Sequence, residues 1–106
     1  MSALVLFSQI TRKLSTLYPY LDKSSLLSAP SLEYKGRAFA CCRDGLLTIK
    51  INDRQRLELL GVKSNHSNGT ILSRKNGKWV QIPYYYHMDW ETLTEIALED
   101  AVAEFG

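Results

Sequence analysis

The stretch YKGRAFACCRDGLLTIKI, residues 34–51, decides the fold of this chain. Two apolar runs flank a turn at Arg43-Asp44-Gly45, where the glycine supplies a positive φ. Pairing the runs across this turn predicts a β-hairpin with Cys42 opposite Leu46, Cys41 opposite Leu47, Phe39 opposite Ile49 and Arg37 opposite Ile51. Because side chains alternate along a strand, one face of the hairpin is predicted to be apolar and to carry Phe39, Cys41, Leu47, Ile49 and Ile51.

The segments around this hairpin predict helices at both ends of the chain. Apolar residues three and four apart predict a helix over 3–21 that ends near Pro19. The Ser-rich residues 22–31 predict a loop in which Leu26 and Leu27 tuck against the core. Strands are predicted at 32–34, 70–74 and 78–83, with a turn at Asn76-Gly77, and helices at 52–61 and 90–105, the second capped by Asp89. This order predicts an α+β two-layer sandwich, a mainly antiparallel five-stranded sheet packed on one side by the N- and C-terminal helices.

Length and composition predict an ordinary globular protein. The chain has 106 residues, of which 45% are hydrophobic and 23% charged, so we expect a single domain over residues 1–106 with one core. No apolar run approaches the roughly 20 residues of a membrane span, and the apolar start lacks the basic flank of a signal peptide. A strand directs the adjacent Cys41 and Cys42 to opposite faces, which favours free thiols in a reducing compartment. The expected location is the cytoplasm, without a membrane partner.

Charge is distributed unevenly along the sequence. Residues 1–80 contain all 13 Lys and Arg together with 5 Asp and Glu, whereas residues 81–106 contain 6 acids and no Lys or Arg. Either the acidic final helix lies against the basic body of its own domain, or each charged surface attracts a partner of opposite sign. The first interpretation is the simpler one.

Several motifs follow one another in a recognisable order: Tyr34-Lys-Gly-Arg-Ala-Phe39-Ala, the Asp44-Gly45 turn into Leu47-Thr-Ile-Lys50, Arg56–Gly61, Lys78-Trp-Val-Gln-Ile-Pro83 and a closing helix near Trp90. Over residues 30–105 this arrangement resembles the N-terminal domain of the TfoX/Sxy competence-regulator family and the related MmcQ/YjbR-like domains, which share a secretion-chaperone-like sandwich. The glycine-rich Met-Phe-Gly-Gly entry typical of many members is replaced by Ala29-Pro-Ser-Leu32. The resemblance implies a regulatory or partner-binding role and brings no catalytic residues.

The residue types that carry chemistry are not arranged as known sites require. His66, His87, Cys41 and Cys42 lack metal-ligand spacing, so we expect no metal. The turn glycines do not form a phosphate-binding loop, and no cofactor is expected. A thiol enzyme would need a base near Cys42, which could lie on the open face of the hairpin, but the sequence places neither histidine there. The sequence therefore predicts a protein that is not an enzyme.

One aromatic cluster is unusual for a connecting segment. Residues 84–90, YYYHMDW, either close the core or form a strip that contacts a partner, because Tyr and Trp are enriched at interface hot spots. A basic hairpin tip lies nearby in the sequence. Together these segments supply the candidate partner-binding residues Arg74, Lys75, Lys78, Trp79, Tyr84, Tyr85 and Tyr86. A strip of this kind could also stack the bases of single-stranded nucleic acid, although the acidic final helix would repel phosphates.

The leading hypothesis is a small non-enzymatic interaction module, regulatory in role, that binds a protein partner or a second copy of itself. One alternative is a nucleic-acid-associated factor that uses the basic tip and Tyr84–Tyr86. The other is a small ligand-binding or thiol-dependent protein acting through Cys42.

Overall fold

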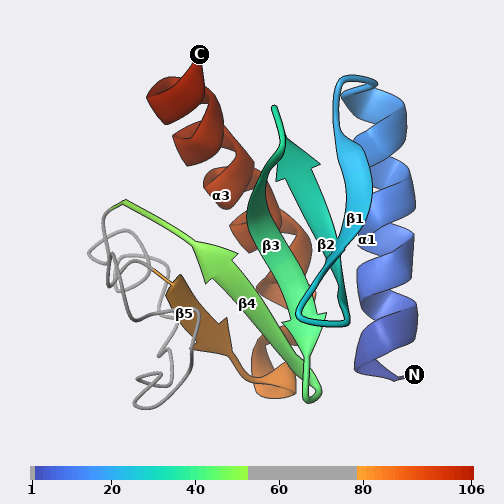
Figure 1. Cartoon of the computed structure of the whole chain (residues 1–106). Helices are drawn as coiled ribbons and strands as arrows, with labels where there is room; N and C mark the ends of the chain where they lie inside the picture. The colour runs from blue at the N-terminus through green and yellow to red at the C-terminus, as the bar shows by residue number, and fades with distance from the viewer. Residues whose placement is uncertain (1, 53–78) are drawn as a thin grey trace.

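The computed structural model describes residues 2–52 and 79–106, and within them it has an α+β fold (Figure 1). The elements in chain order are α1 (Ala3–Leu17), β1 (Asp22–Leu26), β2 (Ala29–Tyr34), β3 (Arg37–Arg43), β4 (Leu46–Lys50), β5 (Trp79–Ile82), the 3₁₀ helix η2 (Tyr84–Asp89) and α3 (Trp90–Phe105). The predicted helix at 52–61, the strand at 70–74 and the Asn76-Gly77 turn fall wholly or almost wholly outside the described residues.

The five strands form one antiparallel sheet in the order β1-β2-β3-β4-β5. Residues from α1 and α3 belong to the same buried cluster as one face of the sheet, so both helices pack on that face (Figure 1). The predicted α+β class, with a terminal helix at each end of the chain, is confirmed. The helix-covered face of the sheet contributes Leu32, Ala40, Cys42, Leu47, Ile49, Val80 and Ile82 to the core.

The prediction of a loop at residues 22–31 is wrong, because this segment forms β1 and the first half of β2. The sequence of β1, DKSSL, shows no apolar alternation, since four of its five residues are exposed. A strand at the edge of a sheet needs no apolar face of its own when its neighbour supplies the buried residues. The first strand of the sheet therefore gave no hydrophobic signal. Leu27 is also not tucked into the core: it is 47% exposed.

Strands β1 to β4 are joined by three turns of the same design. Each turn has two central residues, both with positive φ, as in type I′ hairpins. The φ values are 51° and 75° at Lys35-Gly36, 53° and 76° at Asp44-Gly45, and 52° and 69° at Leu27-Ser28. The first two turns place glycine at the second position, whereas the third has no glycine.

The two-residue turn at Asp44-Gly45 moves the hairpin register by one residue from the prediction. Arg43 lies opposite Leu46, Cys42 opposite Leu47, Cys41 opposite Thr48 and Ala40 opposite Ile49. Cys42 therefore faces the helices, and Cys41 points to the other side of the sheet. Phe39 is the extra residue of a β-bulge against β2 and stays in the core, where it is 1% exposed.

The acidic final helix is held against basic residues of its own domain. Lys13 Nζ lies 2.8 Å from Glu91 Oε2, joining α1 to α3. At the other end of α3, the Arg37 guanidinium lies 4.2 Å from the centre of the Phe105 ring and the Lys50 amine 5.4 Å from it. The Lys13–Glu91 pair is a contact of the kind that the first interpretation of the charge asymmetry expects, whereas the two contacts at Phe105 are cation–π contacts.

Candidate functional site

The structure places the predicted partner-binding residues in three different settings. Arg74, Lys75 and Lys78 lie outside the described residues. Trp79 is buried in β5 at 7% exposure, so it offers little surface to a partner. Tyr84, Tyr85 and Tyr86 lie in η2, which follows β5 directly.

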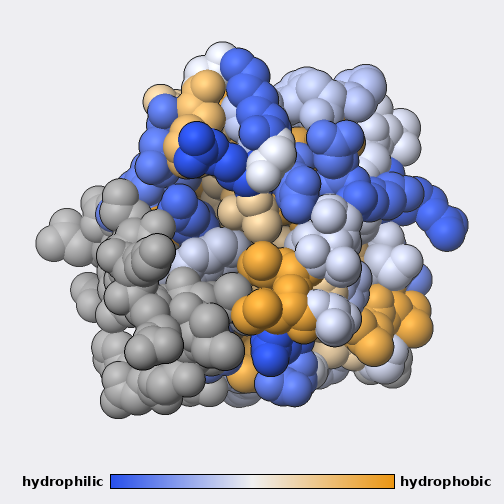
Figure 2. All heavy atoms as spheres, in the orientation of Figure 1, coloured by the Kyte–Doolittle hydropathy of each residue, from blue (hydrophilic) through white to orange (hydrophobic). Residues whose placement is uncertain are grey.

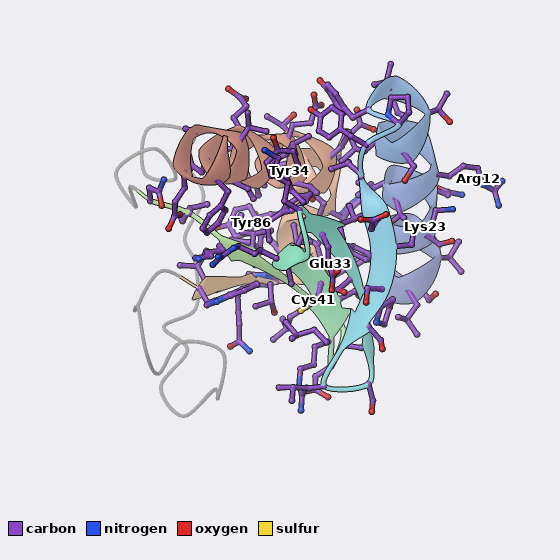
Figure 3. All side chains as sticks on the ribbon, turned by 45° about the horizontal axis from the view of Figure 1, so that its top comes forward. Arg12, Lys23, Glu33, Tyr34, Cys41 and Tyr86 are labelled. Atoms are coloured by element: carbon purple, nitrogen blue, oxygen red, sulfur yellow. The ribbon has the colours of Figure 1, made fainter. Side chains whose placement is uncertain are left out.

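The three tyrosines do not form a continuous exposed strip. Tyr84 is half-buried, stacked on His87 with 4.9 Å between ring centres, and meets the Trp90 ring edge-on at 5.5 Å. Tyr86 is half-buried as well (labelled in Figure 3) and packs against the core cluster. Tyr85 is 78% exposed, so it is the member of the three that a partner could reach most fully.

The thiols are not available for chemistry in the folded chain. Cys41 is fully buried and Cys42 is 2% exposed. Burial raises the pKa of Cys41 to about 11, partly offset by Thr48 across the ladder, and burial also raises the pKa of Cys42. The expected open position of Cys42 is wrong, because the register directs it toward the helices. A buried thiol with a raised pKa is a poor nucleophile.

The sequence did not point to a cluster of exposed apolar side chains, here called the apolar end: Leu4, Val5 and Leu27. They are 58%, 48% and 47% exposed. Figure 2 shows two groups of apolar side chains on the lower part of this face, one over the β1–β2 turn and the other over the N-terminal half of α1. The buried side chains of α1 are Phe7, Ile10, Thr11 and Leu14, so Leu4 and Val5 are not part of the side of the helix that packs on the sheet.

Two residues of the apolar end, Leu4 and Leu27, line a hollow of about 410 Å³. Its lining includes Leu4 of α1, Leu27 of the β1–β2 turn, the buried Ala29 and Cys42, and the polar Arg43 and Asp44. Arg43 stands at the rim, where its guanidinium donates a hydrogen bond to the Leu27 carbonyl oxygen at 3.2 Å. This contact helps hold the turn in place beside the hollow.

The turn that carries Leu27 adopts a backbone conformation that its residues disfavour. Leu27 and Ser28 both have positive φ without the relief that glycine gives. Such positions cost on the order of 1–2 kcal/mol per residue and often mark functional segments. An exposed leucine on a strained turn is therefore an unexpected combination, since neither its backbone nor its side chain is favoured by folding alone.

Other site classes find no support in the described part of the chain. Its His, Cys, Asp and Glu residues form no group of three that could hold a metal ion. Its helices are too short or too polar to cross a membrane. No protein-family model, curated protein or solved structure matches this chain.

Proposed function

We propose that this protein is a small interaction module that works by binding another polypeptide at the apolar end. The observation that carries this proposal is Leu27, which is held at positive φ on an exposed turn beside a hollow. The regulatory role implied by the TfoX-like sequence motifs is part of the same proposal and rests on those motifs.

Two physical arguments support a protein partner. Burying exposed Leu or Val side chains against a partner contributes roughly 25 cal/mol per Å² of apolar surface removed from water. A hollow lined in part by Leu4 and Leu27 also gives a partner side chain a place to anchor, and anchors of this kind supply most of the affinity in protein interfaces. The exposed Tyr85 and Met88 of η2, at 78% and 85%, offer a further contact.

The test separates the side chain of Leu27 from the strain of its turn. Leu27→Asn combined with Ser28→Gly creates the Asn-Gly pair preferred at type I′ turns and removes the apolar contact. Ser28→Gly alone relaxes the turn and keeps Leu27. Both variants are expected to fold at least as stably as the parent chain.

Association is measured first by sedimentation velocity over a range of concentrations, and then by affinity capture from the native host with quantitative mass spectrometry. We expect a self-associated species or a captured protein that is retained by Ser28→Gly and lost with the double variant. If the parent chain stays monomeric and no captured protein distinguishes the two variants, the proposal is wrong.

A nucleic-acid-associated function remains the second proposal, because Tyr85 is exposed and six of the 13 Lys and Arg residues lie in 53–78. Its test is single-stranded DNA binding at several salt concentrations, with Tyr85→Ala as the variant. A steep fall of affinity with salt that also depends on Tyr85 supports this function.

Thiol-dependent chemistry at Cys42 lacks an accessible thiolate.

A further inference from the structure

A second hollow, of about 360 Å³, lies at the end of the molecule where α1 finishes. Tyr18 and Tyr20, which follow α1, form one side, and the C-terminal half of α3 forms the other. Helix α3 lines the hollow with the apolar side chains of Leu98 and Val102 and the acidic side chains of Glu95 and Glu99. This size falls within the usual range of small-ligand sites.

The aromatic side of this hollow is built from rings that hold one another. The Tyr18 and Tyr20 ring centres are 5.9 Å apart at an interplanar angle of 60°. Tyr20 also meets Tyr34 of β2 edge-on, with 5.4 Å between centres at 76°. Figure 3 shows Tyr34 beside α3, at the same end of the molecule. Tyr20 is 50% exposed, yet its ring is kept in place by neighbours on two sides.

The acidic side is not neutralised equally at its two carboxylates. Lys13 is bonded to Glu91, and its pKa is raised by that hydrogen bond and charge and to a smaller extent by Glu95. Glu99 takes part in neither of the two ion pairs found in the described part of the chain. Helix α3 contains no Lys or Arg, so no residue of the helix balances Glu99.

We propose that this hollow binds an organic cation, an ammonium or guanidinium group carried on an apolar stem. The stem lies along Leu98 and Val102, a tyrosine ring faces the cation, and the charged head sits at Glu99. Aromatic faces attract such cations, and a carboxylate adds charge-assisted hydrogen bonds. The source is either a small amine or the Arg or Lys side chain of a polypeptide. The site is independent of the apolar end, so either proposal can fail without the other.

The experiment is an NMR titration of ¹⁵N-labelled protein with two probes, agmatine and acetyl-Gly-Arg-Gly-amide. Two control compounds separate the charge from the stem. Acetyl-Gly-Leu-Gly-amide carries an apolar stem without a charge, and guanidinium chloride at equal ionic strength carries the charge without a stem. We expect saturable shifts confined to residues 18–21 and 95–103 with a charged probe, and none that saturate with either control. Binding of agmatine alone would indicate that the ligand is a small amine, and binding of the peptide alone would indicate a polypeptide side chain. Binding of both would indicate a site that recognises the cation and apolar stem that the two probes share.

Three variants decide whether the hollow is the site. Glu99→Gln removes the unbalanced carboxylate, and Tyr20→Leu removes the aromatic face while keeping an apolar side chain. Each is expected to weaken binding about fivefold or more. Glu104→Gln removes an equal charge from the same helix outside the hollow, and its dissociation constant should stay within about twofold of the parent value. The proposal would be overturned if neither charged probe bound saturably at concentrations up to about 10 mM. It would also be overturned if Glu99→Gln and Glu104→Gln lost affinity equally.

Discussion

At the scale of single residues, a register shift of one position exchanges the surroundings of the two cysteines. With a two-residue turn at Asp44-Gly45, Cys42 pairs with Leu47 on the helix-covered face, and Cys41 pairs with Ser31 and Thr48 on the opposite face. Both thiols are nevertheless buried. Burial therefore decides the chemistry of this pair, and it raises the pKa of Cys41 to about 11, which makes that thiol a poor nucleophile.

The raised pKa of Cys41 makes stability depend on alkaline pH. The thiol ionises near 9.0 when unfolded and near 11 when folded, so the folded state keeps a proton that the unfolded state loses. The contribution of Cys41 to the free energy of unfolding is fully present below pH 9 and is lost as the pH rises toward 11. Over this pH window, the free energy of unfolding measured in urea should fall by roughly 2–3 kcal/mol more in the parent chain than in Cys41→Ala. Parallel pH curves for the two proteins would contradict this linkage.

At the scale of elements, the turns explain what the sequence could and could not predict. Lys35-Gly36 and Asp44-Gly45 are glycine turns between apolar runs, and both were recognisable, as was α3 with its regular apolar spacing. Leu27-Ser28 adopts the same turn without glycine, and the exposed strand before it has no apolar alternation. The β1–β2 hairpin was missed for these two reasons. The apolar end was missed with it, because Leu27 reaches the surface through that hairpin.

The three turns also predict opposite effects of glycine substitutions. Ser28→Gly places glycine where φ is +69° and should raise the free energy of unfolding by about 1 kcal/mol. Gly45→Ala places a side chain where φ is +76° and should lower it by about 1 kcal/mol. A Cβ at Gly45 would meet no atom within 4 Å, so the loss would come from backbone conformation and not from a clash. Urea denaturation of both variants measures the two changes, and shifts of the same sign would refute this assignment of strain.

At the scale of the whole molecule, one core within residues 2–52 and 79–106 joins α1 and α3 to the sheet. Trp90 lies at the start of α3 with no exposed surface, and its indole Nε1 donates a hydrogen bond to the Pro83 carbonyl oxygen at 3.2 Å. This bond ties the end of β5 to the final helix. The sequence predicted a helix at 90–105, and within it Trp90, Leu93, Ile96 and Ala97 are buried. It could not predict the hollow beside Tyr18 and Tyr20, which depends on where α1 ends relative to α3.

A single core should unfold as a single unit. Phe39→Ala empties a site that is 1% exposed and should cost about 3–5 kcal/mol, a large share of the 5–15 kcal/mol typical of a domain. Far-ultraviolet circular dichroism and tryptophan fluorescence should report the same midpoint in urea. Separate midpoints, or a loss below about 1 kcal/mol, would count against the shared core.

The run of two-residue turns from β1 to β4 has a consequence for the order in which the chain folds. Closing a loop of two residues costs little chain entropy, and hairpins form in about 1–10 μs, so the four strands can assemble by local steps. Strand β5 joins later, because β4 ends at Lys50 and β5 begins at Trp79. Turn substitutions such as Gly45→Ala should then slow folding, whereas truncations at Val80 should mainly speed unfolding.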